Sequence, residues 1–167
     1  MVLPIRKLGD PVLRERCRDV GAVDAEVKRL IGDMEETLGL SSGHGLAASQ
    51  VGSVKRLFVY DVGYGHRCMI NPDILEAEGV STHEEGCLSI PGVYVPVTRP
   101  ESIRVRCSTP SGHRIVIEPG GFLSRIFQHE TDHLEGVLVI DRCGEEERKR
   151  ALAEYDELQI EREQAGA

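Results

Sequence analysis

The segment from residue 119 to residue 136 constrains the fold more than any other part of this chain. Pro119-Gly120-Gly121 is typical of a helix start and Gly136 of a helix end, so we expect a helix that runs to about Leu134. Apolar residues lie on more than one face of this helix, which is typical of a helix buried at the centre of a domain. The rest of the chain is therefore expected to cover it.

The residues from Val54 to about Glu118 have a different character. Short β-branched or alternating runs are separated there by Gly, Pro and Asn-Pro turns. The strands predicted from these runs are Arg56–Asp61, Arg67–Asn71, Gly92–Val97, Ser102–Cys107 and Arg114–Glu118. We therefore expect an α+β fold in which mostly antiparallel strands pack around the central helix.

Two further helices are expected, one toward each end of the chain. The N-terminal one spans Asp24 to Leu40, where apolar residues recur at helical spacing and Asp24 can cap the start. The C-terminal one spans Gly144 to about Gln164 and has only a thin apolar side. It is acidic, because eight Asp and Glu stand against four Lys and Arg from Gly144 onward.

Length, charge and cysteine content narrow the functional classes. The chain has 167 residues, which is enough for about one domain. Its formal net charge of −8 disfavours general nucleic-acid binding, so we expect no DNA partner. No stretch approaches the roughly 20 apolar residues that span a bilayer, and the N-terminus lacks a signal-peptide core, so no membrane partner is expected. The five scattered cysteines are odd in number, which favours reduced thiols and a cytoplasmic protein.

The central helix carries the pattern His129-Glu130-Thr131-Asp132-His133. Residues i and i+4 share one face of a helix, so both imidazoles can bind one metal ion through nitrogen. Glu130 follows the first of them and can exchange a proton with water at an open metal position. The pattern is short, so a third ligand is needed to support a metal site.

Two residues compete for the place of the third ligand. If Glu154, on a later helix, is the third ligand, the metal site is that of a metallopeptidase. Cys87, within Glu84-Glu85-Gly86-Cys87-Leu88-Ser89, would give a thiolate with two imidazoles, which leaves one position of a tetrahedral site open for water. A third histidine at the spacing HExxHxxGxxH is excluded, because Val139 stands at its position. A structural metal site or a peptide-binding module is the non-enzymatic alternative.

A third segment, Gly43–Gln50, is rich in small residues. Small residues let the backbone approach a ligand closely, and the side-chain amide of Gln50 can donate to a developing oxyanion. On its own the segment is equally compatible with a simple helix terminus.

Together the three segments resemble the peptide deformylase family. Its signature is a GxGxAAxQ loop, an EGCLS strand and a QHExDH helix, which stand here in the same order as Gly43–Gln50, Glu85–Ser89 and Gln128–His133. The similarity runs from about Leu3 to Asp141. It implies a deformylase-like catalytic domain over residues 1–143, with residues 144–167 as an acidic helix and tail of the same domain.

The resemblance implies a metal-dependent hydrolase that removes the formyl group from N-formylmethionine of nascent polypeptides and releases formate. The implied ligands of one divalent ion are Cys87, His129 and His133, with Fe(II) as the first choice and Zn, Ni or Co as substitutes. A metal-bound hydroxide would attack the formyl carbon, with Glu130 as general acid and base.

The resemblance also implies an oxyanion site and a substrate site. Gln50 and the backbone N–H of Leu88 would hold the formyl oxygen, and the peptide would lie as an added strand. The residues expected to contact the substrate are His44, Gly45, Leu46, Gly86, Leu88 and Ile126. His44 stands where the family commonly has an aliphatic residue, so we expect it to line the pocket or face solvent rather than to take part in catalysis.

Two further expectations come from the family. Glu85 and Arg99 are expected to form a buried pair that orients the strand carrying Cys87. Some members dock near the ribosomal exit tunnel through a basic C-terminal helix, whereas the helix from Gly144 is acidic here. Any contact with the ribosome is therefore expected to be weak or to lie elsewhere.

Overall fold

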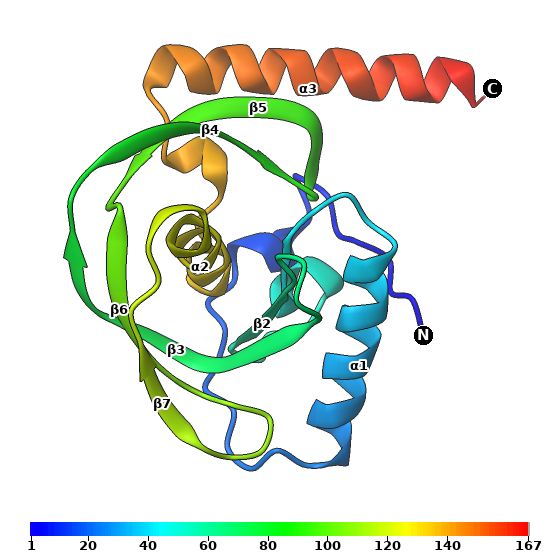
Figure 1. Ribbon diagram of the computed structural model, residues 1–167. Helices are drawn as coiled ribbons and strands as arrows, with labels where there is room; N and C mark the ends of the chain where they lie inside the picture. The colour runs from blue at the N-terminus through cyan, green and yellow to red at the C-terminus, as the bar shows by residue number, and fades with distance from the viewer. Residues whose placement is uncertain (167) are drawn as a thin grey trace.

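The structure, a computed structural model, describes residues 1–166. At its centre lies α2 (Gly121–Leu134), which Figure 1 shows end-on with the strands curving around it. Phe127 of α2 is fully buried and meets the rings of Phe58 and Tyr60 in edge-to-face contacts with centroid distances of 5.2 and 5.0 Å. The predicted α+β architecture is confirmed, and the central helix is the scaffold on which the strands pack.

Within residues 1–166, seven strands form two antiparallel sheets. The five-stranded sheet has the order β1-β2-β3-β6-β7, and its strands are β1 (Gly45–Ala47), β2 (Leu57–Tyr60), β3 (Arg67–Glu78), β6 (Ser102–Ser108) and β7 (Arg114–Ile117). The two-stranded sheet consists of β4 (Ser81–Cys87) and β5 (Ile90–Arg99). Short 3₁₀ helices lie at Pro11–Arg14, Ala48–Val51 and Val139–Asp141.

Strand β3 is longer than the sequence pattern predicts. The Asn-Pro pair predicts a turn at Asn71, but the strand continues to Glu78. Its register against β6 shifts directly after Ile70, so a bulge accommodates the proline within the strand. Asn71 has a φ of 52°, and its side chain bonds both the backbone N–H and the C=O of Val20 at 2.8 Å. These two hydrogen bonds to the segment around Val20 hold the bulge in place.

Helix α1 (Ala25–Gly39) covers the outer face of the large sheet near β1 and β2, in agreement with the predicted N-terminal helix. Asp24 caps it, because its carboxylate accepts a hydrogen bond of 2.9 Å from the N–H of Val27. One face of the helix packs in an apolar cluster with β1 and β2, and the buried residues on that face are Val27, Ile31, Met34 and Leu38. This packing fixes the strand β1, which follows the Gly-rich segment.

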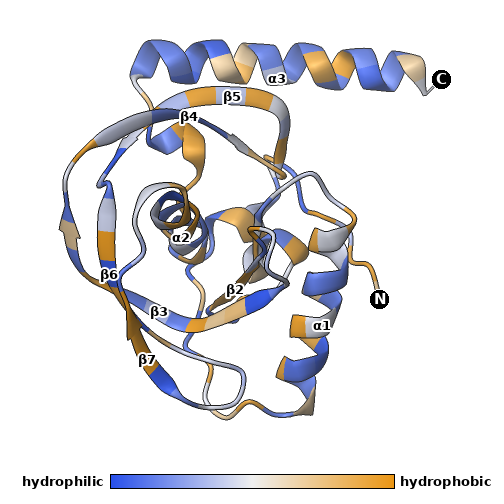
Figure 2. Ribbon diagram, viewed as in Figure 1, coloured by the Kyte–Doolittle hydropathy of each residue, from blue (hydrophilic) through white to orange (hydrophobic). Residues whose placement is uncertain are grey.

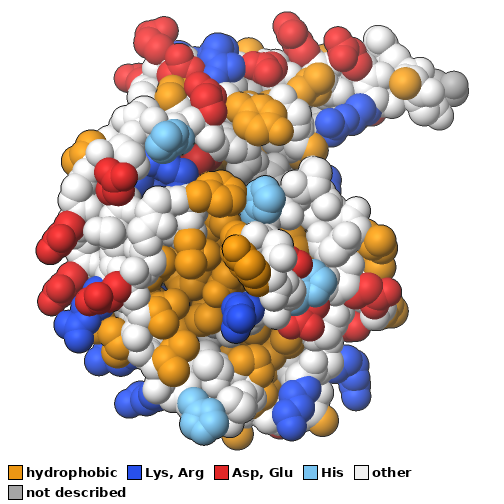
Figure 3. Space-filling model, viewed as in Figure 1, with side chains coloured by type: hydrophobic (Ala, Val, Ile, Leu, Met, Phe, Trp, Pro, Cys, Tyr) orange, Lys and Arg blue, Asp and Glu red, His pale blue; other side chains and the backbone are white. Residues whose placement is uncertain are grey.

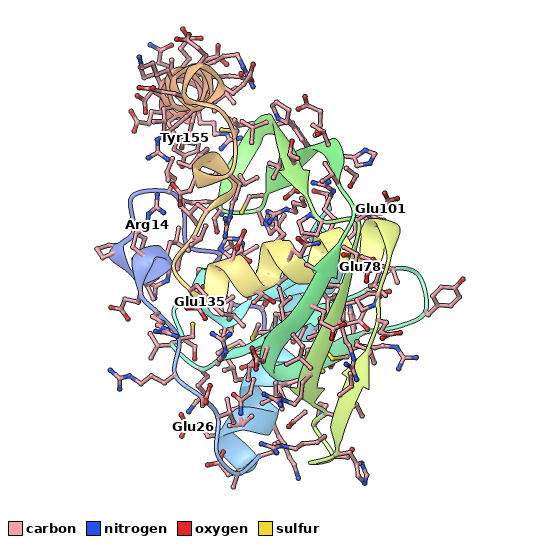
Figure 4. The ribbon with its side chains drawn as sticks, turned by 90° about the vertical axis from the view of Figure 1, so that its left-hand side faces the viewer. Arg14, Glu26, Glu78, Glu101, Glu135 and Tyr155 are labelled. Carbon is pink, nitrogen blue, oxygen red and sulfur yellow. The ribbon has the colours of Figure 1, made fainter. Side chains whose placement is uncertain are left out.

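Helix α3 (Glu145–Ala165) lies along β5 on the outside of the molecule, and Figure 2 shows that most of its surface is hydrophilic. Its buried residues are Ala151 and Tyr155, and Figure 4 shows Tyr155 on this helix, at the outer edge of the molecule. The guanidinium of Arg150 donates a hydrogen bond of 2.9 Å to the carbonyl of Tyr94 in β5. No helix in the described part of the chain is long and apolar enough to cross a lipid bilayer.

Candidate metal centre and active site

Cys87, His129 and His133 come together at the centre of the molecule. One ligand atom from each, the Sγ of the cysteine and a ring nitrogen of each histidine, lies within 4.8 Å of the others. The Sγ of Cys87 is 3.3 Å from the Nε2 of His133. Helix α2 presents both histidines on one face, and the end of β4 brings the cysteine to them. A thiolate with two imidazoles is a donor set that suits a divalent transition metal, so these residues fit one.

The electrostatics of Cys87 differ from those of the other buried cysteines. Burial raises the pKa of the Cys87 thiol, but the adjacent His133 and His129 outweigh burial and hold that pKa well below its usual value. The thiolate is the form that binds metals. At the other three buried cysteines burial dominates and raises the thiol pKa, to about 11 for Cys17, about 12 for Cys68 and about 11 for Cys107. Those three are packing residues.

A buried carboxylate, Glu85, stands behind the histidine ligand. It accepts hydrogen bonds from the Nδ1 of His129 at 2.9 Å and from two nitrogens of Arg99 at 2.7 and 3.0 Å. Burial raises the pKa of Glu85, but the hydrogen bonds from His129 and Arg99 lower it to about 2. Because Nδ1 donates to this carboxylate, the Nε2 of His129 is left as the metal-facing nitrogen. The expected buried pair of Glu85 and Arg99 is thus present.

Arg125 completes this network, although sequence reasoning did not single it out. It is 7% exposed, and its guanidinium donates to Glu85 and to the carbonyls of Val97 and Ser81 at 2.9 Å each. Helix α2 is thereby tied to both strands of the small sheet. The available signal was a cation one turn before His129 on a helix expected to be buried, since such a charge needs a partner.

Glu130 lies against the Gly-rich segment. Its side chain is 4% exposed, and burial raises its pKa. Its Oε1 has no hydrogen-bond partner among residues 1–166. A β-carbon at position 45 would be 2.6 Å from its Oε2, so a larger residue there would have to displace this carboxyl group. The result is a buried carboxyl group beside the three candidate ligands that is able to accept and release a proton.

The side-chain amide of Gln50 is fixed in one orientation. Its Oε1 accepts a hydrogen bond of 2.9 Å from the N–H of Ala47, and its Nε2 donates to the Oγ of Ser89 at 3.1 Å. The same Nε2 lies 3.6 Å from the Sγ of Cys87. The amide N–H₂ is therefore aimed at the candidate metal centre.

The two glycines around His44 explain the GxG spacing of the loop. A β-carbon at Gly43 would be 2.9 Å from the Cδ1 of Leu88, just as one at Gly45 would meet Glu130. The residue between them points elsewhere: the ring of His44 meets that of Phe122 edge-to-face at 5.2 Å. The loop thus packs against the candidate site through its glycines and leaves His44 exposed.

A cavity of about 690 Å³ opens beside these groups. Figure 3, viewed along α2 as in Figure 1, shows apolar side chains gathered at the centre of this face. The expected substrate residues that line the cavity are His44, Gly45, Gly86, Leu88 and Ile126. The other lining residues include His83, Tyr94 and Phe122, which sequence reasoning did not select.

The structure does not bring Leu46 to this cavity. Leu46 is fully buried in the apolar cluster beneath α1. It follows Gly45 in β1, and successive side chains of a strand point to opposite faces. We therefore leave Leu46 out of the substrate site.

Glu154, the competing third ligand, lies away from the candidate centre. It is on α3, where its carboxylate pairs with Arg150 at 2.7 Å and its side chain is 42% exposed. Among the residues that the structure describes, Cys87 is the one that joins the two histidines in a possible metal cluster. The metallopeptidase alternative therefore loses its third ligand.

Comparison with known proteins points to one family. Residues 2–149 match the family described as polypeptide deformylase. A peptide deformylase of Dictyoglomus turgidum is 45% identical over 146 residues, which cover 87% of this chain and 95% of that protein. The crystal structure of peptide deformylase from Thermotoga maritima has a TM-score of 0.84 at 45% identity, covering 86% of this chain and 99% of that one.

A second solved structure extends the similarity over the whole described fold. A peptide deformylase from Legionella pneumophila has a TM-score of 0.92 at 34% identity, covering 99% of this chain and 98% of that one. Sequence and fold therefore indicate the same family. The chain belongs to the polypeptide deformylase family.

Proposed function

We propose that Cys87, His129 and His133 hold the divalent metal ion of this deformylase and that Glu130 is its general acid and base. Peptide deformylases are metal-dependent enzymes that remove the N-formyl group from nascent peptides. The observation that carries the proposal is the cluster of three ligand atoms within 4.8 Å, next to a carboxyl group that is 4% exposed.

The proposed ion is Fe(II), with Zn, Ni or Co able to take its place, because a thiolate and two imidazoles suit each of them. When bound, the ion supplies Lewis acidity where water and the formyl carbon meet. Glu85 keeps the ring of His129 oriented toward the ion through the bond of 2.9 Å to Nδ1. Metal analysis of protein purified without oxygen identifies the ion.

Glu130 moves the proton in this proposal. It takes a proton from the attacking water and delivers it to the methionine nitrogen as the C–N bond to the formyl carbon breaks. The products are formate and a free amine. The orphaned Oε1 of Glu130 supports this role, because a buried carboxyl oxygen without a protein partner has capacity left for water or substrate.

Gln50 and the backbone N–H of Leu88 stabilise the negative charge that develops on the formyl oxygen. The amide of Gln50 is held by Ala47 and Ser89, so it need not reorient when the charge develops. This preorganisation is what makes a hydrogen-bond donor effective in the transition state.

The peptide binds as an added strand between the segment around His44 and Gly45 and the end of β4 at Gly86, with Ile126 in the wall of the cavity. Two features support this position. The cavity of about 690 Å³ is large enough for the methionine side chain and the adjoining backbone. Within the described residues, β4 pairs with β5 alone, so its other edge has no strand partner.

The proposed setting is the cytoplasm, where nascent formylated chains are made. Contact with the ribosome near the exit tunnel is proposed to be weak and not carried by α3. The negative charge of that helix, eight Asp and Glu against four Lys and Arg from Gly144 onward, would repel the phosphates of ribosomal RNA.

The decisive experiment measures formate release from formyl-Met-Ala-Ser by anaerobically purified protein, with the metal content determined on the same sample. We expect formate at about one metal ion per chain, loss of activity with retained metal in Glu130→Gln, and loss of both in Cys87→Ser. Fully metallated protein that releases no formate would contradict the proposed reaction. A Cys87→Ser variant with unchanged metal content would contradict the ligand set.

A further inference from the structure

A second cavity, of about 480 Å³, shares no lining residue with the first. Four arginines from four separate segments line it, together with polar groups of β3 and β6. The arginines are Arg16, Arg56, Arg106 and Arg114. This concentration is unexpected in a chain whose formal net charge is −8.

Strands β6 and β7 supply one wall of this cavity. On β6, Val105 and Cys107 are buried toward α2, so Arg106 and Ser108 point outward. Arg114 of β7 is paired directly opposite Ser108. Residues on the same face at diagonal positions of neighbouring strands lie about 7–8 Å apart, so the sheet presents two guanidinium groups with a hydroxyl between them.

The opposite wall is held in place by Glu135, which Figure 4 labels at one end of α2 beside the segment that carries Arg14. Glu135 accepts from Arg56 at 2.5 Å and lies 3.0 Å from the Nε of Arg16. Arg56 also donates to the carbonyl of Pro72 at 2.9 Å, and its side chain is only 14% exposed. Arg56 is therefore held in place by Glu135 and Pro72.

The hydrogen-bond donors that remain available in the cavity belong to positively charged guanidinium groups. The carboxylates that face it are Asp19, Asp73 and Glu135, so positive charge exceeds negative charge by one. Asp73 bonds one nitrogen of Arg106 at 2.8 Å, which leaves the rest of that guanidinium available. Across residues 1–166, Arg114 forms no ion pair.

We propose that this cavity binds a phosphate-bearing anion through Arg106, Ser108 and Arg114. Guanidinium groups present paired N–H donors that match two phosphate oxygens, and a preformed pocket reduces the entropic cost of binding. The site goes beyond deformylation, because none of its lining residues belongs to the cavity that contains Glu130. The phosphate can belong to a free small molecule or to the backbone of an RNA.

The test uses the metal-loaded enzyme with two probes, inorganic phosphate followed by NMR and a fluorescent RNA duplex followed by anisotropy at several salt concentrations. Arg106→Gln and Arg114→Gln are compared with Arg104→Gln. Arg104 is the matched control, because it lies on the same outer face of β6 but pairs with Glu76 and Glu118 outside the cavity. Formate release by all three variants is expected to stay at the level of the unsubstituted enzyme.

We expect each cavity substitution to weaken anion binding about tenfold and Arg104→Gln to leave it within about twofold. Binding of inorganic phosphate identifies a small-molecule site. Binding of RNA alone, with a salt slope that falls by about one per arginine removed, identifies a backbone contact. The proposal is overturned if neither probe binds, if the control weakens binding equally, or if binding survives both cavity substitutions unchanged.

Discussion

Gly45 and Glu130 are in such close contact that a β-carbon at position 45 would lie 2.6 Å from the carboxylate Oε2. This contact defines where the carboxyl group of Glu130 can sit relative to the three candidate ligands. The glycine at position 45 is therefore needed to keep the Glu130 carboxyl group where it stands.

Gly45→Ala is expected to lower formate release by about 10²-fold, because the new methyl group would displace Glu130, the proposed general acid and base. Metal content is expected to remain near that of the unsubstituted enzyme. Steady-state kinetics with formyl-Met-Ala-Ser and metal analysis check both. Gly32→Ala, in α1 with no atom within 4 Å of a new β-carbon, is the control, and an equal loss there would contradict the explanation.

Glu85→Gln is expected to weaken metal affinity about 10–100-fold, because the bond that orients His129 is lost. It is also expected to lower the free energy of unfolding by about 3–5 kcal/mol, since Arg99 and Arg125 lose their shared buried carboxylate. Chelator competition and urea unfolding measure the two effects. Unchanged metal affinity and stability would refute the orienting role, and the exposed neighbour Glu84 supplies the control as Glu84→Gln.

His44→Ile is expected to retain formate release within a few-fold of the unsubstituted enzyme. The ring of His44 is exposed and packs edge-to-face on Phe122 at the cavity, and His44 is not among the three candidate metal ligands. Parallel assays of His44→Ile and Glu130→Gln make the comparison. A loss in the histidine variant as large as that in the glutamate variant would assign His44 a catalytic role.

Asp141 is expected to make stability depend on pH in the acid range. Burial raises its pKa, but hydrogen bonds from Arg14, from the N–H of Leu138 and from Arg148 lower it to about 2. A carboxylate with a lowered pKa stabilises the fold above its unfolded value of about 3.9, and this stabilisation is lost as the pH falls toward 2. Allowing for solvent screening at this part-exposed group, the contribution is about 1–2 kcal/mol.

The variant Asp141→Asn checks this by urea unfolding between pH 2 and pH 7. The difference in unfolding free energy between it and the unsubstituted enzyme is expected to be largest at neutral pH and to shrink below about pH 4. Asp156→Asn, at an exposed position of α3, is the control. A difference that stays constant across this pH range would contradict the role of Asp141.

The central helix and the three candidate ligands were predictable because each depends on local or motif information. The spacing of His129 and His133 follows from the helical repeat, and Cys87 is identified by the segment around it. The contacts of Arg125 were not predictable, because they depend on the pairing of β4 with β5 and on the position of α2 against both strands. Periodicity says which face of a helix is buried, but not which carboxylate lies opposite it.

One strand escaped prediction and another was predicted only at its end, for physical reasons. The resemblance implies a strand at Glu85–Ser89, whereas β4 begins at Ser81. β4 has the sequence STHEEGC, in which Glu85 is the one buried residue, so it has no apolar alternation to indicate a strand. β1 has three residues, too few to show a period. Recognition of β1 as a strand would have shown that Gly45 and Leu46 face opposite sides. The wrong expectation that Leu46 contacts the substrate follows directly from that omission.

The hydrogen bond from Arg150 to the carbonyl of Tyr94 links the outermost helix to a residue that lines the candidate substrate cavity. The ring of Tyr94 in turn covers Gly86, where a β-carbon would be 2.6 Å from its Cε1. A surface helix of largely charged composition is therefore in direct contact with the wall of this cavity. Through Arg150, a substitution on the outside of α3 can shift Tyr94 and with it the shape of that wall.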